Sequence, residues 1–310
     1  MTEIIPKQED SKVRGIIFMN LFCICTTAVG CIFKKLAEEG VSNLDFAIFR
    51  ALVGLFCISL YNWYLGSKPW EEIPRRHYAK MFARSLGGTW GFILYTYIIT
   101  ILPLTLTTVV FQTNPFWMSV LGICFLGERI MKVEIIGIVL CFGGVVMVTL
   151  APSDAEVSTD SNVLLFGVSL CLVMAWTHSF VQMFNRMMRD VPWYTIMFWH
   201  STIGLCTASI IVGILALING GTIFSYSGRQ YGLLVLCAFL DFLGLSCSVI
   251  TFQSCEMGFI SLFGYLIVVY SFLADLFVFH ETFGLMEICG TLVILTVTMG
   301  VGLYKYWLER

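Results

Sequence analysis

Two charged residues lie inside long apolar stretches of the chain, where a charge is costly. Asp241 has eleven uncharged residues on each side, and Arg50 lies within an apolar run from residue 46 to residue 65. A carboxyl group in such a position must be protonated, paired with a cation or in contact with water. Asp241 is therefore a candidate for proton binding and release, with a structural hydrogen bond to a neighbouring helix as the alternative.

Arg50 allows two interpretations. A central arginine in a membrane helix costs about 2.5–3.5 kcal/mol on insertion scales, so a functional one must bind an anionic group or pair with a carboxylate. Arg50 lies only about one helical turn into its apolar run, and a long side chain there can also reach the lipid headgroups. The sequence leaves both ligand binding and anchoring open.

Further polar and aromatic residues recur within the apolar stretches, several of them at helical spacing, which places them on shared helix faces. Together with Arg50 and Asp241, the residues we expect to line a cavity are Asn20, Lys34, Trp90, Tyr97, Gln112, Asn114, His178, Gln182, His200 and Tyr265. For any single residue of this set, hydrogen bonding between neighbouring helices is the alternative.

Motifs for catalysis are missing. The sequence contains no GxSxG, no HExxH and no glycine-rich phosphate loop after a strand. Its 12 cysteines form no CxxC and no Cys/His pattern at zinc spacing. We therefore expect no catalytic residues, no metal and no cofactor. A membrane-embedded enzyme and a non-transporting scaffold are the alternatives to a transporter.

Composition sets the class of the protein. Of its 310 residues 58% are hydrophobic and 12% charged, whereas about 25% of the residues in a soluble domain are charged. The net charge of −2 and the lack of a basic run exclude a nucleic-acid partner. The predicted fold is an all-α membrane protein in a lipid bilayer, with ten transmembrane helices near 15–33, 46–65, 82–101, 105–126, 133–150, 162–184, 194–218, 230–252, 257–279 and 285–304.

Basic residues orient these spans. With the N-terminus in the cytoplasm, 14 of the 18 Lys and Arg residues, Arg84 included, fall in cytoplasmic segments. Lys34, Lys35 and Arg229 fall outside, and Arg50 lies within a span. Because cytoplasmic loops carry the excess of basic residues, we expect both termini inside and the acidic connector 151–161 outside. The plasma membrane is the favoured location, and an endomembrane is the alternative.

An internal repeat divides the chain into two halves. A shift of 153 residues matches Glu128, Glu134 and Gly137 to Glu281, Glu287 and Gly290. A shift of 150 residues matches FRALVG at 49–54 to WHSTIG at 199–204, with His200 opposite Arg50. Five spans per half give the halves opposite orientations, as in many secondary transporters. We expect Glu128 and Glu281 to cap helix ends.

The predicted organisation follows from the spans and the repeat. It comprises a cytoplasmic tail 1–14, a first five-helix repeat 15–150, an extracytoplasmic connector 151–161, a second repeat 162–305 and a cytoplasmic tail 306–310. The fifth and tenth spans are apolar apart from small residues and threonine, which permit close helix approach. We expect them to pack rather than to line a cavity, and they are candidates for a homodimer contact.

Several segments resemble the EamA family of the drug/metabolite transporter superfamily, to which nucleotide-sugar transporters are related. These segments are LDFAIFRALVG in the second span, LTLTTVVFQTNPFWMSVLGICFLGE in the fourth and IIGIVLCFGGVVMV in the fifth. The second half departs from the pattern, because Val268 stands opposite Pro115 and His280 opposite Gly127. The resemblance implies a multi-pass transporter of a small molecule that works by alternating access. Arg50, Lys34 and Lys35 give a weak preference for an organic anion.

The orientation can be tested by cysteine labelling. We expect Ser158→Cys, but not Ser11→Cys, to react with a membrane-impermeant thiol reagent in intact cells, because basic residues keep the N-terminus inside. Labelling of Ser11→Cys without labelling of Ser158→Cys would refute the orientation.

Overall fold

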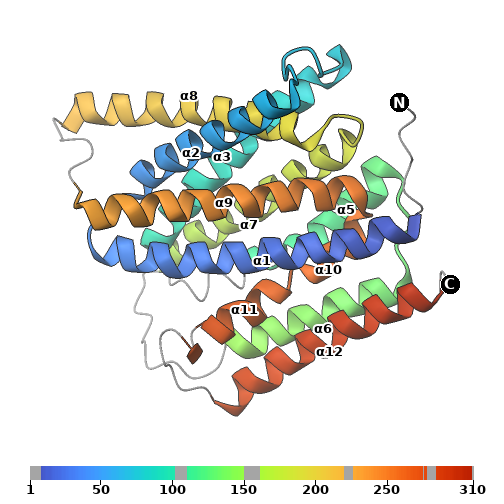
Figure 1. Ribbon diagram of the computed structural model, residues 1–310. Helices are drawn as coiled ribbons and strands as arrows, with labels where there is room; N and C mark the ends of the chain where they lie inside the picture. Colours follow the sequence, from blue (N-terminus) through green and yellow to red (C-terminus); the bar gives the residue numbers. More distant parts are fainter. Residues whose placement is uncertain are drawn as a thin grey trace.

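The computed structural model describes residues 8–101, 110–149, 161–219, 226–274, 276–277 and 284–308, and within these ranges it contains helices and no strand. The first half contributes α1 (Gln8–Glu38), α2 (Asn43–Leu65), the 3₁₀ turn η1 (Arg75–His77), α3 (Tyr78–Ile101), α5 (Asn114–Leu126) and α6 (Lys132–Thr149). The second half contributes α7 (Ser161–Met187), α8 (Trp193–Asn219), α9 (Gly228–Ser254), α10 (Met257–Phe263), α11 (Leu266–Ala274) and α12 (Leu285–Leu308). Figure 1 shows these helices running lengthwise through one bundle.

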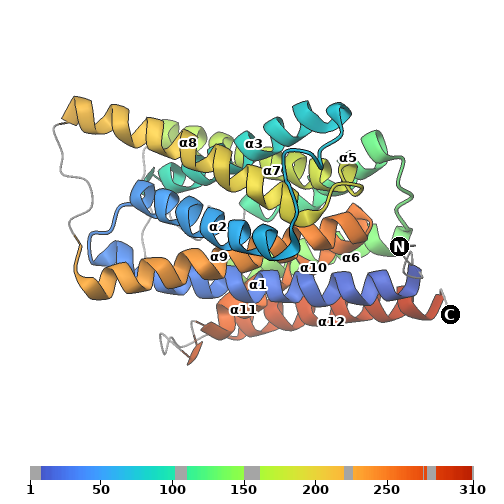
Figure 2. The same ribbon diagram turned by 45° about the horizontal axis from the view of Figure 1, so that its top comes forward.

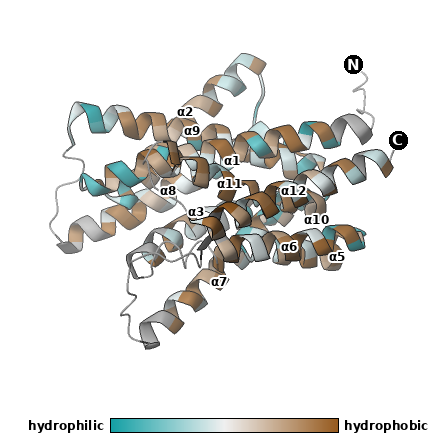
Figure 3. Ribbon diagram, turned by 90° about the horizontal axis from the view of Figure 1, so that it is seen from below, coloured by the Kyte–Doolittle hydropathy of each residue, from teal (hydrophilic) through white to brown (hydrophobic). Residues whose placement is uncertain are grey.

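The described helices have the length and composition of membrane spans. Six helical segments are long and apolar enough to cross a bilayer: Lys12–Glu38, Asn43–Leu65, Leu165–Met187, Trp193–Ile214, Gly228–Ser254 and Met257–Ala274. Asn114–Leu126 and Ile288–Tyr304 are shorter apolar helices. Figure 3 shows mostly apolar residues along the helices. Within a bilayer a helix satisfies its own backbone hydrogen bonds, which explains the all-α fold of a membrane protein with this composition.

Matching helices of the two halves run in opposite directions. The described start of α1 and end of α12 lie at the same end of the bundle, which we call the terminal face, and we call the other end the opposite face (Figure 1). Helices α1 and α2 run to and from the opposite face, whereas their counterparts α7 and α8 run to and from the terminal face. The structure thus has the two-repeat architecture, with the repeats inverted.

The two halves interlock helix by helix. The most extensive contacts join α1 to α9, α3 to α7, α2 to α8 and α6 to α12, and each of these pairs combines one helix from each half. Both views place α2 between α8 and α9 (Figures 1 and 2). By comparison, α2 and α3 of the first half touch each other little. Most of the packing energy therefore depends on both halves together.

The predicted spans 105–126 and 257–279 are not continuous helices. Residues 112–113 form a turn before α5, and Pro115 lies in the first turn of α5, where its missing N–H is not needed. A second turn at residues 264–265 separates α10 from α11. The expectation of one unbroken ninth helix was wrong, and the interruption of the fourth span lies directly before Pro115. Residues 102–109 of the fourth span lie outside the described ranges.

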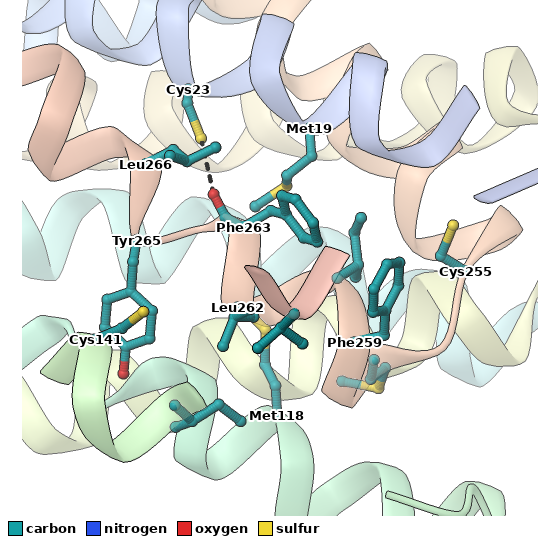
Figure 4. Packing of buried hydrophobic residues seen from close by; sticks show 14 of the residues in the cluster. Met19, Cys23, Met118, Cys141, Cys255, Phe259, Leu262, Phe263, Tyr265 and Leu266 are labelled. Carbon is teal, nitrogen blue, oxygen red and sulfur yellow. Dashed lines mark hydrogen bonds between the residues drawn. The ribbon is translucent and has the colours of Figure 1, made fainter. Parts of the chain in front are cut away.

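Hydrogen bonds and packing stabilise the break between α10 and α11. The Cys23 thiol of α1 donates a weak 3.8 Å bond to the carbonyl oxygen of Phe263, one of the groups freed by the break. Around it, Met19, Leu262 and Tyr265 belong to a buried apolar cluster between α1 and α6 (Figure 4). Because a bilayer offers no water to a free carbonyl, the break has to lie inside protein.

Helices α6 and α12 approach closely through glycine. A Cβ atom at Gly144 would lie 2.8 Å from Ile294 Cγ1 and 2.9 Å from the carbonyl oxygen of Gly290. The neighbouring Gly143 has no such contact within 4 Å. The fifth and tenth spans therefore pack on each other along one edge of the bundle (Figure 1).

This pair of glycines provides a matched test of the packing. Gly144→Ala should lower the free energy of unfolding by about 1–3 kcal/mol, because the new methyl group meets a backbone atom. Gly143→Ala should change it by less than about 1 kcal/mol and in the stabilising direction, since alanine favours a helix. The measurement is the free energy of unfolding of both purified variants in detergent. Equal changes at Gly143 and Gly144 would contradict the close contact of α6 with α12 at Gly144.

Candidate functional site

The two charged residues of the apolar stretches form an ion pair with each other. Arg50 Nε of α2 lies 2.5 Å from Asp241 Oδ2 in the middle of α9, and the side chains are 15% and 18% exposed. The Arg50 guanidinium also lies over the ring of Phe92, 4.6 Å from its centroid. Of the interpretations that the sequence leaves open, the structure shows Arg50 paired with a carboxylate and Asp241 paired with a cation.

A small cavity adjoins the ion pair. Its volume is about 30 Å³, and it is lined from the first half by α2 and α3 and from the second half by α8 and α9. Such a volume holds about one or two water molecules. Arg50, Asp241 and His200 are the predicted site residues that line it. Within this conformation the cavity is too small for a metabolite, so a larger ligand requires the helices to part.

Residues matched by the repeat meet at this cavity. Arg50 and Gly54 of α2 line it together with their counterparts His200 and Gly204 of α8. A Cβ atom at Gly54 would lie 2.9 Å from Ser201 Oγ, so the glycine allows α2 and α8 to cross closely. The cavity therefore lies between equivalent faces of the two inverted repeats.

A second group of predicted residues forms a hydrogen-bonded chain between α5 and α7. Nδ1 of His178 lies 2.6 Å from Asn114 Nδ2, and Nε2 of His178 lies 3.2 Å from Gln182 Nε2. Ser179 donates a hydrogen bond to the side chain of Asn114. Asn185 then donates to Gln182 Oε1 at 2.8 Å. These residues are not among those that line the cavity.

Arg84 ends this chain and was missed as a site residue. Its Nε donates to Asn185 Oδ1 at 2.9 Å, and the residue is only 2% exposed. The charge count places Arg84 in a cytoplasmic segment, whereas the structure buries it between helices. Its position inside the predicted span 82–101 was the signal that could have identified it.

Several predicted site residues lie elsewhere. Trp90 and Tyr97 lie on the exposed side of α3, 55% and 51% exposed, and Lys34 is exposed near the end of α1. Spacing groups residues on one face of a helix without showing which way that face points. Tyr265 is fully buried in the apolar cluster shown in Figure 4. These four residues do not line the cavity.

The two remaining candidates are also outside the cavity. Asn20 Oδ1 accepts a 2.8 Å hydrogen bond from Tyr270, which joins α1 to α11. Gln112 is buried in the turn before α5, and its Nε2 has no hydrogen-bond partner among the described residues. Asn20 therefore has the interhelical role that the sequence left open as the alternative.

Glu128 ties the two halves together at the terminal face. Its carboxylate accepts from the backbone N–H of Met257 at 2.7 Å, which caps α10, and from Arg186 Nε at 3.0 Å. Arg186 also donates to the carbonyl oxygen of Gln253 at 2.9 Å. This is the helix-capping role expected from the sequence, across the two repeats. Glu281, its counterpart, lies outside the described residues.

Loops of opposite halves are also linked by ion pairs at the terminal face, and we call such a contact between loops a clasp. Asp190, between α7 and α8, pairs with Arg76 at 2.5 Å and with His77 at 3.1 Å in the turn before α3. Partial burial opposes ionisation of Asp190, but the hydrogen bonds from Arg76 and His77 outweigh it and lower its pKa. Asp190 is therefore ionised at neutral pH and holds this clasp closed.

A corresponding clasp closes the opposite face. Tyr226, before α9, donates a hydrogen bond to Asp45 in the first turn of α2, and Arg229 pairs with Glu39 at 3.3 Å. Burial and the bond to Asp45 raise the pKa of Tyr226, so its hydroxyl keeps its proton. At the terminal face the α2–α3 loop meets the α7–α8 loop, and at the opposite face the α1–α2 loop meets the α8–α9 loop. The repeat relates the first pair of loops to the second.

The described residues contain no group of three or more His, Cys, Asp or Glu side chains able to hold a metal ion.

Comparison with known proteins identifies the family. The model of the EamA-like transporter family matches residues 13–150 and again residues 165–303. A crystal structure described only as "Crystal structure of protein" superposes with a TM-score of 0.79 at 12% identity, covering 97% of this chain and 99% of the other. A search of curated proteins gave no significant match. Members of the matched family are transporters and not enzymes, and this chain, a multi-pass integral membrane protein with two repeats, belongs to the EamA-like transporter family.

Proposed function

We propose that the chain is a secondary transporter that moves a small organic anion across a membrane by alternating access. The observation that carries this proposal is the ion pair between Arg50 of the first half and Asp241 of the second, beside a cavity in the bundle interior. Substrate sites of transporters with inverted repeats lie between the repeats, near the middle of the membrane.

The two clasps support the alternating mechanism. Each joins loops of opposite halves, one at the terminal face and one at the opposite face. Both are closed in this conformation, and the cavity between them holds only water-sized molecules. Opening one clasp while the other stays closed would give the cavity access to one side of the membrane at a time.

The interrupted helices support the same proposal. The turns at residues 112–113 and 264–265 lie within one residue of corresponding positions in the fourth and ninth spans, since the repeat shift of 153 residues places 112–113 opposite 265–266. Breaks at matched positions of inverted repeats are typical of helices that move or bind substrate in transporters. They give each half a point at which its helix can bend.

Charge favours an anionic substrate. Arg50 and Arg84 both lie inside the bundle, and among the described residues Arg50 pairs with a carboxylate, Asp241, whereas Arg84 pairs with none. A buried charge without a counter-ion is costly, so an anion is the ligand that this interior stabilises best. Coupling to protons would use Asp241, because its protonation removes the charge that holds Arg50.

Orientation, membrane and assembly complete the proposal. We place both termini in the cytoplasm, because most basic residues lie in the segments on that side. The plasma membrane is the favoured location. A homodimer through the exposed outer faces of α6 and α12 stays a prediction.

Asp241→Asn tests the proposed coupling. The variant should fold and bind substrate but lose most pH-driven accumulation, while exchange of substrate for substrate partly survives, because an amide cannot take up or release the proton. The measurement is uptake into reconstituted vesicles with an imposed pH gradient.

Glu71→Gln is the control for this experiment, since Glu71 is an exposed carboxylate whose ion-pair partner in the described part of the chain is the exposed Lys68. It should accumulate substrate like the parent protein. If Asp241→Asn also matches the parent at every pH, Asp241 is only a structural partner of Arg50 and the coupling proposal fails.

A further inference from the structure

We propose that Arg84, assisted by His200 and Ser85, binds the oxyanion group of the substrate, a carboxylate or a phosphate. This inference rests on the proposed transport of an organic anion and names the residues that recognise the charge. It assigns anion recognition to Arg84 and leaves Arg50 as the partner of Asp241.

The first reason is the charge of Arg84, which lacks a counter-ion. Among the described residues no carboxylate pairs with Arg84, and its one hydrogen bond goes to the neutral Asn185. Its Nη1 is buried and makes no hydrogen bond. Arg50, by contrast, is neutralised by Asp241. An unpaired buried charge is strongly destabilising, so a fold that keeps one has a use for it.

The second reason is that other unsatisfied polar atoms surround Arg84. His200 Nδ1 and Ser85 Oγ are both buried and without a hydrogen-bond partner in the described structure. Arg84, Ser85 and Gly88 share a face of α3 at helical spacing. His200 lies against that face, because a Cβ atom at Gly88 would be 3.0 Å from its Cε1. Three unsatisfied groups from α3 and α8 therefore gather at one place.

The chemistry of these groups selects an oxyanion. A guanidinium can only donate hydrogen bonds, and a hydroxyl and an imidazole can both donate to an acceptor. Carboxylates and phosphates offer several acceptor lone pairs and a negative charge, and their bonds to arginine are among the strong ones. A cation would be repelled by Arg84, and a neutral ligand would leave its charge uncompensated.

Position links this group to the cavity. His200 lines the cavity beside Arg50 and Asp241 and also lies against α3 near Arg84. An anion that enters the cavity therefore meets His200 before it reaches Arg84. The chain of Asn185, Gln182 and His178 holds Arg84 by its Nε and leaves its Nη1 for the ligand.

Thermal unfolding of the purified full-length protein tests the assignment. The probes are inorganic phosphate and succinate, each compared with chloride at equal ionic strength. The melting temperature of the parent should rise by at least about 2 °C with one of the probes at saturation, because a ligand of the folded state stabilises it. Arg84→Met should lose that rise, and Arg129→Met, which removes an exposed arginine outside both clasps, should keep it.

A second variant covers the case in which Arg84→Met does not fold. Arg84→Lys keeps the positive charge but loses the planar set of N–H donors of the guanidinium. The probe concentration that gives half-maximal stabilisation should therefore increase by at least about tenfold. The assignment is overturned if the parent responds to neither probe, if Arg84→Met keeps the rise, or if Arg84→Lys leaves the half-maximal concentration unchanged.

Vesicle transport separates this inference from the proposed function. If Arg84→Met transports an organic anion at the parental rate, the anion site is wrong and the transport function stands. If the parent shows the Arg84-dependent response to a probe but moves no substrate into vesicles, the site stands and the transport function fails.

Discussion

The architecture depends on one electrostatic constraint, a pair of opposite charges held away from bulk water inside an apolar bundle. Arg50 and Asp241 are 2.5 Å apart and mostly buried. Each charge alone would cost several kcal/mol there, and each is tolerated because the other faces it. Since one comes from each repeat, the two halves have to meet at this point whenever the pair is formed.

The interlocked repeats explain how such a pair can be positioned. Helices α2 and α8 cross through Gly54, which lets the backbones approach and brings Arg50 and His200 to one cavity. Helix α9 packs against both α1 and α2 and presents Asp241 from its middle. Because the main contacts join helices of opposite halves, a shift of one repeat against the other alters the cavity and both clasps together.

Sequence reasoning recovered the features that follow from composition and repetition. Apolar runs predict the helices, the matched segments around Arg50 and His200 predict the inverted halves, and isolation in an apolar run identifies Asp241. The family of the chain was also recognisable from the segments in its first half, and the family model matches both halves.

Details that depend on helix rotation and tertiary contact were not predictable. Trp90 and Tyr97 share a helix face with the right spacing, but that face points outward. The break at residues 264–265 has no proline to announce it, because packing and the hydrogen bond from Cys23 stabilise it. Arg84 resembled a basic residue at the membrane surface, and only the neighbouring helices show that it is buried.

The most direct measurement is a double-mutant cycle on Arg50→Met and Asp241→Leu that follows unfolding free energy and transport together. If the pair is retained for function, each single variant loses about 3–5 kcal/mol of stability, because it leaves one buried charge without a partner. The double variant should regain most of that stability and still be inactive in vesicles. Additive losses of stability, or a double variant that transports like the parent protein, would contradict this account.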